Sequence, residues 1–232
     1  MLQLWVIPLK QTKTVIKACQ AFLDPEESER ALRFVTEELQ NNYIVAHGAM
    51  RQILSNYLKV IPSSLQFQVG QRGKPGREGV YFNLSHTRDW AILAVNKHCE
   101  VGVDIESQQR PADVMSLAKR FFSEMEYQKL IELETNELKL KHFYKIWTAK
   151  EATIKCTGEG LYRELDSFLV SEDDQGRWFV APLKGGKNNI FVPLDGLNLE
   201  VIELTLGKIP HVVSVVMSAK IQPIKRQFWS LP

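Results

Sequence analysis

Two short segments hold the residues best suited to chemistry. Residues 101–106 read Val-Gly-Val-Asp-Ile-Glu, an alternation of apolar and polar residues that is typical of a half-buried strand. Asp104 and Glu106 then share one face of this strand, opposite its apolar side chains. Residues 147–155 have the pattern of a helix, in which Glu151 and Lys155 lie one turn apart on the same side.

This combination of carboxylates and a lysine suits a divalent cation together with a phosphate. Mg²⁺ prefers oxygen ligands, keeps several waters and typically completes its shell with substrate phosphate, while a lysine neutralises charge on that phosphate. Each pair also has a simpler interpretation. Asp104 and Glu106 fit the solvated face of an edge strand, and Glu151 with Lys155 fits a surface pair that stabilises a helix. The presence of both pairs in one chain favours the metal and phosphate interpretation.

Two further segments carry groups that can meet a nucleotide. Gly73-Lys74-Pro75 lies in the Gly- and Pro-containing segment 70–76, which predicts a loop, and its lysine and backbone N–H groups suit a phosphate or a base. Ser85 and His86 can both donate to phosphate oxygens. The simpler interpretations are a turn and an ordinary strand-end pair. A Ser-His nucleophile is rejected because adjacent strand residues point to opposite faces, and zinc is rejected because the histidines and cysteines lack ligand spacing.

Composition indicates an ordinary globular chain. Its 232 residues, 44 % apolar and 24 % charged, allow one large domain or two modest ones. A net charge of +2 gives no argument for nucleic acid, and no segment approaches the roughly 20 apolar residues that span a membrane. The first residues lack the basic region of a signal peptide. The three cysteines, an odd number without metal-ligand spacing, predict a reducing, cytoplasmic location.

The order of elements predicts an α+β fold whose first half covers residues 1–107. Asp24-Pro25 is a typical helix start, and the helix that follows is expected to turn Ala31, Leu32 and Phe34 inward. Further helices are predicted at 13–23 and about 40–58, and strands at 3–7, 65–69, 80–84, 90–95 and 100–106.

The second half is predicted to cover residues 108–220, after a polar junction at 107–112. A loop is expected at 184–189, and residues 221–232 are interpreted as an irregular C-terminal strap. The two halves have similar element content, although no sequence repeat is visible. Helices are predicted at 113–121, 123–134 and 137–156, and strands near 167–171, 177–181, 198–205 and 211–218.

The segment from Arg120 to Glu126 combines a helix start with apolar residues. Ser123 and Glu126 have the spacing of a capping box, in which each side chain binds the other residue's backbone N–H. Phe121 and Phe122 are expected in the core, or as part of a docking face for a partner helix.

Taken together, these motifs resemble the 4′-phosphopantetheinyl transferases of the large, surfactin-synthetase-activating type. The resemblance extends from about residue 24 to residue 171. The matching segments are Gly73-Lys74-Pro75, Phe82-Asn83-Leu84-Ser85-His86, Gly102–Glu106, Arg120–Ser123 with Glu126, and Trp147–Lys155 followed by Gly158, Gly160 and Leu161.

The resemblance implies a pseudo-twofold monomer of two similar α+β halves, with coenzyme A in the cleft between them. It implies transfer of 4′-phosphopantetheine from coenzyme A to a serine hydroxyl of an apo carrier protein, with release of adenosine 3′,5′-bisphosphate. Mg²⁺ is the implied metal, and Mn²⁺ is possible. Acyl, polyketide and peptidyl carriers all remain open as the acceptor.

The resemblance also assigns residues. Asp104, Glu106 and Glu151 are expected to hold the metal, and Lys155 to meet the pyrophosphate. Arg30 is expected to meet the 3′-phosphate. The coenzyme A-binding set is Arg30, Gly73, Lys74, Pro75, Ser85, His86, Asp104 and Lys155.

Two positions depart from the family pattern. Glu27 and Asn42 stand where the pattern has basic residues that meet the 3′-phosphate. Arg33 or Arg51 is expected to compensate, so Arg51 joins the predicted coenzyme A-binding residues.

The transfer needs a base for the serine hydroxyl. Glu151 is the first candidate, directly or through a metal-bound water, although a metal ligand loses basicity. Glu126 is the second. The docking face for an acidic carrier is predicted around Lys119, Arg120, Phe121, Phe122 and Met125.

Two other functions stay open. One is a homologue that binds coenzyme A or a carrier without catalysis, and the other is a Mg²⁺-dependent nucleotide hydrolase. The residues predicted to be catalytic are Glu151, Lys155 and Glu126.

Overall fold

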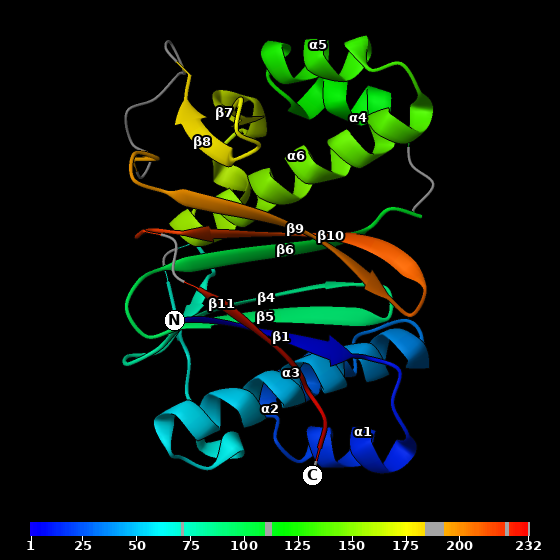
Figure 1. Ribbon diagram of the computed structural model, residues 1–232. Helices are drawn as coiled ribbons and strands as arrows, with labels where there is room; N and C mark the ends of the chain where they lie inside the picture. The colour runs from blue at the N-terminus through cyan, green and yellow to red at the C-terminus, as the bar shows by residue number, and fades with distance from the viewer. Residues whose placement is uncertain (71, 110–112, 184–192, 221–222, 232) are drawn as a thin grey trace.

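The computed structural model describes residues 1–70, 72–109, 113–183, 193–220 and 223–231. The chain forms four layers, with a helical layer at each end and two β-sheets between them (Figure 1). Within the described residues, no helix has both the length and the apolar character needed to cross a bilayer. Part of the expected junction at 107–112 and the expected loop at 184–189 lie outside the described residues.

The first helical layer and the first sheet come from the N-terminal part of the chain. The 22-residue helix α3 (Glu37–Leu58) is the longest element there, capped at its start by the Thr36 side chain. The other elements are β1 (Leu2–Pro8), α1 (Lys13–Gln20), α2 (Pro25–Ala31), a 3₁₀ turn (Pro62–Ser64), β2 (Gln68–Val69), β3 (Pro75–Gly76), β4 (Tyr81–Thr87) and β5 (Trp90–Asn96).

The second sheet and the second helical layer follow. Helix α6 (Asn136–Thr157) also has 22 residues, begins at a threonine cap, Thr135, and ends at Gly158 in the left-handed region. The other elements are β6 (Val101–Ser107), α4 (Val114–Phe121), α5 (Glu124–Glu132), 3₁₀ turns (Gly160–Tyr162 and Leu165–Ser167), β7 (Phe168–Glu172), β8 (Trp178–Pro182), β9 (Asn198–Leu206) and β10 (Ile209–Met217).

The same order of elements occurs twice. A strand, three helices, a small hairpin and two more strands run from β1 to β5 and again from β6 to β10. The two sheets match, because β1-β5-β4 and β6-β10-β9 have the same strand order. The predicted α+β class with two similar halves is therefore confirmed. The predicted boundary after residue 107 is wrong for β6, which pairs with β10 and opens the second unit.

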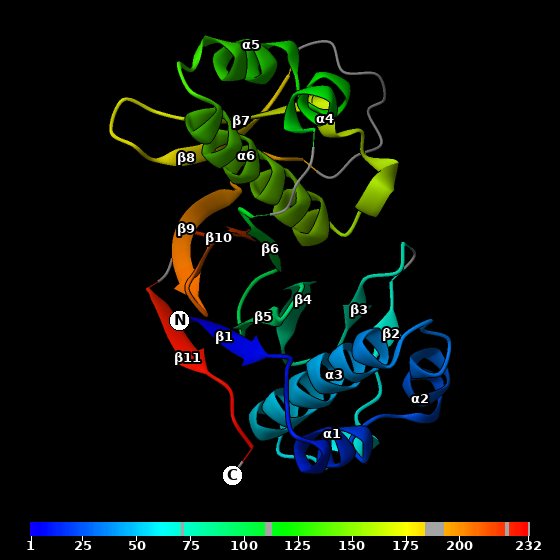
Figure 2. The same cartoon turned by 90° about the vertical axis from the view of Figure 1, so that its right-hand side faces the viewer.

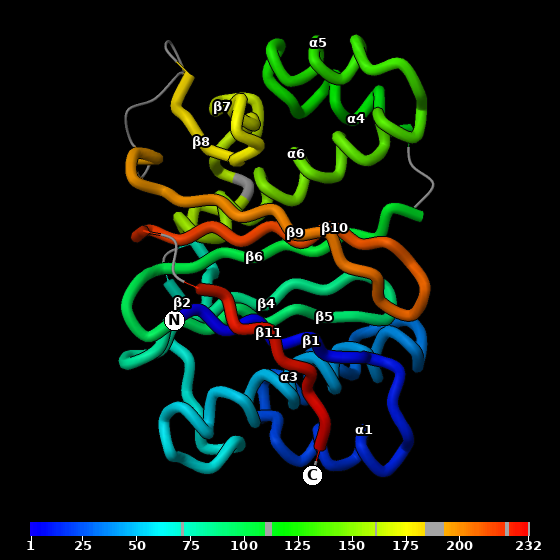
Figure 3. The backbone as a smooth tube through the Cα atoms, viewed as in Figure 1, coloured from blue at the N-terminus to red at the C-terminus, as the bar shows by residue number. Residues whose placement is uncertain are grey.

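The C-terminal segment is more regular than predicted. Residues Ile224–Phe228 form β11, which pairs in parallel with β1 at the edge of the first sheet (Figure 3). Trp229 follows it into the core, where its indole N–H donates to the Gln52 side chain of α3 at 2.7 Å. The expectation of an irregular strap is thus corrected, because β1 offers an edge with which this segment can pair.

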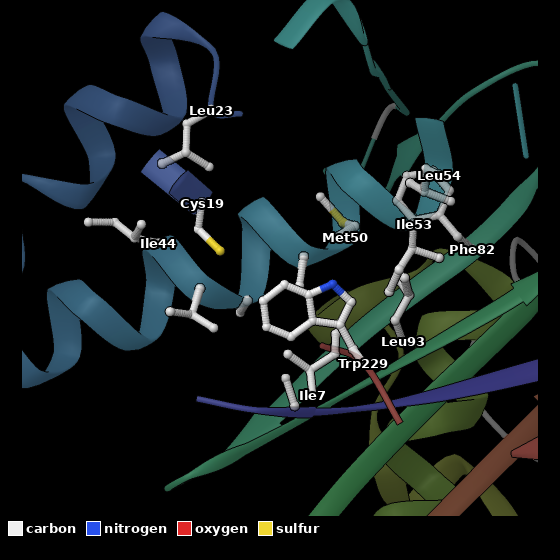
Figure 4. Close-up of a cluster of buried hydrophobic side chains, with 14 of the residues drawn as sticks. Ile7, Cys19, Leu23, Ile44, Met50, Ile53, Leu54, Phe82, Leu93 and Trp229 are labelled. Carbon is white, nitrogen blue, oxygen red and sulfur yellow. The ribbon is translucent and has the colours of Figure 1, made fainter. Parts of the chain in front are cut away.

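Three apolar clusters hold the layers together. One lies between α3 and the first sheet and includes Met50, Leu93 and Trp229 (Figure 4). A second lies between the two sheets, and a third lies between α6 and the second sheet. Val101, Val103 and Ile105 belong to the cluster between the sheets, which confirms the alternation predicted for β6.

The corner between α2 and α3 differs from the prediction. Helix α2 ends at Ala31, which is buried, but Leu32 is 73 % exposed and Phe34 is 37 % exposed. Only the first of the three residues predicted to face inward therefore does so. The chain leaves the helix before the other two positions, so the helical period no longer applies to them.

Candidate active site

Strands β4 and β6 lie side by side where the two sheets meet (Figure 2). They belong to separate sheets, and polar side chains of β4 bridge them. Asn83 accepts from the Val103 N–H at 2.9 Å, and Ser85 donates to Asp104 at 2.7 Å. Thr87 donates to Glu106 Oε2 at 3.2 Å. We call this contact the seam.

Gly102 sets the distance between β6 and α6. A Cβ atom at this position would lie 2.0 Å from the Ala152 carbonyl oxygen and 2.4 Å from the Cys156 nitrogen. No side chain fits there, so the strand touches the helix backbone directly. This approach brings Asp104 on β6 next to Lys155 on α6.

Lys155 and Asp104 form the centre of the site. The ammonium group lies 2.6 Å from Asp104 Oδ1 and 3.1 Å from Ser85 Oγ. Asp104 is only 5 % exposed, and its second oxygen, Oδ2, is buried without a hydrogen-bond partner. A buried carboxylate oxygen left in this way is costly unless a cation or a donor meets it.

Glu151 adds further negative charge. Burial raises the pKa of Glu151, and the carboxylates of Asp104 and Glu106 raise it further, against the opposing effect of Lys155. Three carboxylates and one ammonium group therefore lie within electrostatic range of one another. A divalent cation would relieve this excess.

The donor set fits Mg²⁺ in type, since all three side chains offer oxygens. Across the described ranges, no group of three or more His, Cys, Asp or Glu side chains is arranged so that it could hold a metal ion by itself. The predicted ligands are thus brought into one region without forming a closed cage. Water and substrate oxygens would have to complete the shell, as is usual for Mg²⁺.

A hollow of about 570 Å³ opens beside Glu106 and His86. Tyr43 and His47 of α3 line it and stack at 4.0 Å between ring centroids. Arg30, which is exposed, lies 5.8 Å from the Tyr43 ring centroid. Desolvation and the charge of Lys155 lower the pKa of His86, so this imidazole is neutral at neutral pH and can donate through one ring nitrogen.

A second hollow, of about 820 Å³, lies between the predicted 70–76 loop and the end of α6. Lys74 and Pro75 line it together with Thr157 and Gly158. The Lys74 ammonium donates to Glu100 at 2.6 Å and to the Val101 and Cys156 carbonyls at 3.2 and 3.1 Å. This side chain therefore fastens the loop to β6 and α6, while Gly73, with φ +88°, is exposed.

The role predicted for Arg51 is wrong. Its side chain is fully buried and paired with Asp24 and Glu27. It also donates to the Pro62 and Leu65 carbonyls, both at 3.0 Å. A guanidinium with all these partners is not available to a 3′-phosphate.

Arg33, the other arginine expected to compensate, and Asn42, one of the two departures from the family pattern, also have protein partners. Arg33 pairs with Glu29 at 2.7 Å on the surface. Asn42 donates to the Arg88 carbonyl at 3.2 Å and so supports the turn between β4 and β5. Of the arginines considered from the sequence for the 3′-phosphate, Arg30 is the one beside the hollow.

Glu126 is not placed to act as a base. It is fully buried, lies 2.9 Å from the Lys150 ammonium and accepts from the Val170 N–H at 2.7 Å. Its other oxygen forms the predicted capping box with Ser123, which is confirmed. Burial and these partners exclude contact with an incoming serine.

Three of the five residues predicted for the docking face lie on the surface. Lys119, Arg120 and Met125 are exposed. Phe122 is buried and stacks on Phe143 at 5.2 Å, so it belongs to the core. Phe121 is half-buried, edge-on to Trp147 at 5.9 Å.

Sequence reasoning missed Thr87 and His47. Thr87 could have been found from the alternation Asn83, Ser85, Thr87, which mirrors the acidic alternation on β6. His47 pairs with Glu27 at 3.1 Å and faces the hollow. Its position on α3 gives no local sequence signal, because the contact depends on how α2 and α3 pack.

Family models match most of the chain. The model of the 4′-phosphopantetheinyl transferase superfamily matches residues 100–194, and that of the 4′-phosphopantetheinyl transferase N-terminal region matches residues 9–98. The chain is 40 % identical over 164 residues to 4′-phosphopantetheinyl transferase HetI of Nostoc sp., covering 68 % of this chain and 69 % of that protein.

Two further relatives and one solved structure extend the comparison. A putative 4′-phosphopantetheinyl transferase of Synechocystis sp. is 31 % identical, covering 90 % of this chain and 93 % of that protein. The transferase Sfp of Bacillus subtilis is 32 % identical, covering 73 % and 75 %. A holo-(acyl-carrier-protein) synthase from Bacillus anthracis, in complex with CoA (3′,5′-ADP), matches 52 % of this chain and 96 % of its own with 18 % identity and a TM-score of 0.39, an overlap too small to carry an argument.

Proposed function

Because this chain belongs to the 4′-phosphopantetheinyl transferase superfamily, we propose that it transfers the phosphopantetheine group of coenzyme A to a serine hydroxyl of an apo carrier protein. The observation that carries this proposal is the group of Asp104, Glu151 and Lys155 at the seam. It combines an orphaned buried carboxylate oxygen, excess negative charge and a lysine.

In the reaction, the serine oxygen forms a bond to the phosphorus that bears the pantetheine arm. The bond from this phosphorus to the bridging oxygen breaks, and adenosine 3′,5′-bisphosphate leaves with that oxygen. Phosphoryl transfer depends mainly on positioning and on electrostatic stabilisation. Lys155 would shift from Asp104 toward the pyrophosphate oxygens and stabilise the charge that the leaving group gains.

Glu151 is the residue proposed to accept the serine proton. In the metal-free chain the raised pKa of Glu151 gives it a stronger pull on a proton than an ordinary glutamate has, whereas a bound cation would lower this pKa. Glu126, the second candidate, is removed by its burial against Lys150. Glu151 is therefore the remaining carboxylate that sequence reasoning proposed for this step.

Asp104, Glu106 and Glu151 are proposed to hold Mg²⁺, with Mn²⁺ as a substitute. When bound, the metal would screen the pyrophosphate charge. Asp104 Oδ2 supports this assignment because it is buried without a hydrogen-bond partner. The pKa of Glu151, raised first by burial and then by the charges of Asp104 and Glu106, supports it because it places the three carboxylates close together.

The two hollows beside the seam are proposed to hold coenzyme A. His86 lines the hollow next to Glu106, and Arg30 lies over the ring of Tyr43, which also lines it; both would meet phosphate groups. Gly73 and Pro75 would hold the nucleotide through their backbone at the other hollow, where Lys74 fixes the loop. One chain supplies both halves of this arrangement, so a monomer is sufficient.

The carrier is proposed to dock on the exposed residues around the α4–α5 corner, namely Lys119, Arg120 and Met125, with the half-buried Phe121 beside them. An acidic carrier surface would meet the two basic side chains, and Met125, 58 % exposed, would supply apolar contact. Fatty-acid, polyketide and peptidyl carriers are all candidates for this surface.

The test is intact-mass measurement of an apo carrier after incubation with this protein, coenzyme A and Mg²⁺. We expect one added phosphopantetheine mass, which should disappear with EDTA and with Asp104→Ala. Asp173→Ala removes a half-buried aspartate paired with Arg177 and should keep full activity. It controls for the loss of an aspartate elsewhere in the chain.

Other outcomes separate the alternatives. Coenzyme A binding without modification of fatty-acid, polyketide and peptidyl carriers would favour a binding homologue. Release of phosphopantetheine into solution without any carrier would favour a nucleotide hydrolase.

A further inference from the structure

The bridging side chains of the seam differ in what they bind. Asn83 holds a backbone N–H of β6, whereas Ser85 and Thr87 donate to the two carboxylates, Asp104 and Glu106. Hydroxyl groups at alternate positions of β4 thus meet carboxylates at alternate positions of β6. The pairing aligns a row of donors with the row of proposed metal ligands.

Thr87 is the member of this row without an assigned role. It is 7 % exposed and lines the hollow that Glu106 and His86 also line. A threonine is stiff about χ1 because it is β-branched. Its hydroxyl is therefore a donor held in one place, 3.2 Å from Glu106 Oε2.

We propose that Thr87 is a positioning residue for the metal site, whose hydroxyl orients the Glu106 carboxylate toward the divalent cation. The inference rests on the proposed function, because it needs Glu106 to be a metal ligand. Hydrogen bonds from neighbouring groups fix the orientation of metal-binding side chains, and their loss typically weakens metal affinity about 10–100-fold.

A purely structural role is the competing explanation, since the same bond also joins β4 to β6. Asn83 provides the matched control because it bridges the same two strands without touching a carboxylate. Thr87→Val keeps the shape of the side chain and removes the donor, while Thr87→Ser keeps the donor. A structural role would make Thr87→Val and Asn83→Ala behave alike.

The experiment is a titration of the full chain with Mn²⁺, followed by electron paramagnetic resonance of the free ion, with coenzyme A present and carrier absent. We expect Thr87→Val to weaken Mn²⁺ binding by about tenfold or more, and Thr87→Ser and Asn83→Ala to stay within about threefold of the parent. Coenzyme A binding in EDTA, measured by calorimetry, should be the same for all variants.

A double-mutant cycle gives a second, independent test. If Thr87 acts through Glu106, then Thr87→Val should have no further effect on Mn²⁺ affinity in a Glu106→Ala background. Circular dichroism confirms that each variant is folded before titration. If Thr87→Val is unfolded, Thr87→Ser and Thr87→Cys replace it, with the serine retaining Mn²⁺ affinity and the cysteine, a weak donor, losing it.

Several results would overturn the inference. One is a Thr87→Val variant that binds Mn²⁺ as tightly as the parent, and another is a Thr87→Ser variant that binds it as weakly as Thr87→Val. The others are an equal loss of Mn²⁺ affinity in Asn83→Ala and a full effect of Thr87→Val on Mn²⁺ affinity in the Glu106→Ala background. A parent chain that binds no Mn²⁺ would overturn the metal site together with the inference. A parent chain that binds Mn²⁺ but modifies no carrier would contradict the proposed transfer alone.

Discussion

Arg51 and Lys150 occupy the same position in two equivalent helices, counted from the first residue of α3 and of α6. Each is fully buried and pairs with the capping-box glutamate of the preceding helix, Glu27 for Arg51 and Glu126 for Lys150. Each also binds two backbone carbonyls and faces an aromatic ring. Each half therefore has a buried cationic side chain at the equivalent helix position, and in each half this side chain joins three segments of chain.

Lys150→Met should destabilise the protein by about 3–5 kcal/mol, because it leaves the carboxylate of Glu126 buried without its cation. The carbonyls of Leu165 and Phe168, which accept from Lys150 at 2.6 and 2.7 Å, would lose their donor as well. The measurement is the free energy of unfolding in urea.

The double variant Lys150→Met/Glu126→Gln is the control for this pair. Removing both charges should cost less than the sum of the single changes, because neither charge is then left alone. Lys139→Met, at a half-buried position near the start of the same helix and without a buried charge partner of this kind, should change stability by less than about 0.5 kcal/mol. Additive losses in the double variant would show that the two side chains act separately.

The duplication was difficult to see from the sequence because equivalent positions in the two halves hold different residue types. Arg51 and Lys150 differ in residue type, as do the caps Asp24 and Ser123, yet each pair performs one physical task. The pattern of elements predicted two similar halves, because periodicity survives such exchanges. Residue identity does not survive them, so Arg51 looked like a free cation for phosphate.

Gly102→Ala should damage both stability and metal binding. The added methyl group would lie 2.0 Å from the Ala152 carbonyl, so β6 and α6 must move apart. Overpacking of this kind costs about 1–3 kcal/mol, and more where backbone atoms meet. The shift would also separate Asp104 from Lys155. A lower Tm and weaker Mn²⁺ binding are the expected readouts.

Gly76→Ala is the matched change for this test. Its added Cβ would lie 3.9 Å from the Gln68 carbonyl, an ordinary contact. The Tm of this variant should equal that of the parent. An unchanged Tm in Gly102→Ala would contradict the direct contact between strand and helix.

Glu151→Gln should stabilise the metal-free protein at neutral pH. Burial and the charges of Asp104 and Glu106 raise the pKa of Glu151, so its ionised form is disfavoured in the folded chain. The Glu151 carboxyl group therefore contributes to the stability of the folded chain at low pH, where it is protonated. This contribution is lost as the pH rises through the raised pKa of Glu151. The amide carries no charge and avoids this loss. In EDTA, Glu151→Gln should therefore have a higher Tm than the parent near pH 8.

The same comparison should show no difference near pH 4, where the parent carboxyl is protonated in the folded state. Glu132→Gln, on the exposed side of α5, controls for loss of a surface charge and should leave Tm unchanged at both pH values. A Tm advantage that is equal at both pH values would show that the effect of Glu151→Gln does not come from ionisation.

The candidate site was predicted where chemistry is local and missed where it depends on packing. Asp104 and Glu106 on one strand, and Glu151 and Lys155 on one helix, are visible in short segments. Their meeting depends on Gly102, whose role becomes evident only from the 2.0 Å approach to Ala152. Glu126 was assigned a chemical role from the sequence because its burial against Lys150 is not visible there. That contact joins two residues that are far apart in the chain.

Charge reversal at Lys119 and Arg120 should weaken carrier binding without affecting coenzyme A. Both side chains are exposed near the end of α4, and Arg120 lies 5.0 Å from the Phe121 ring centroid. An acidic carrier would meet repulsion from Lys119→Glu/Arg120→Glu. The KM for the carrier should rise about tenfold, with kcat and the KM for coenzyme A nearly unchanged.

Ionic strength distinguishes this effect from a change in fold. Salt screens exposed charges over about 8 Å at physiological strength, so the gap between variant and parent should narrow as salt is added. Lys13→Glu/Lys17→Glu makes the same charge change on exposed residues of α1, in the helical layer at the other end of the molecule (Figure 1). If the acidic carrier is attracted by the α4–α5 corner and not by the net charge of the protein, this control should keep the carrier KM within about twofold of the parent at each salt concentration. Equal KM increases in the two double variants would show that net charge, and not attraction at the α4–α5 corner, sets the carrier KM.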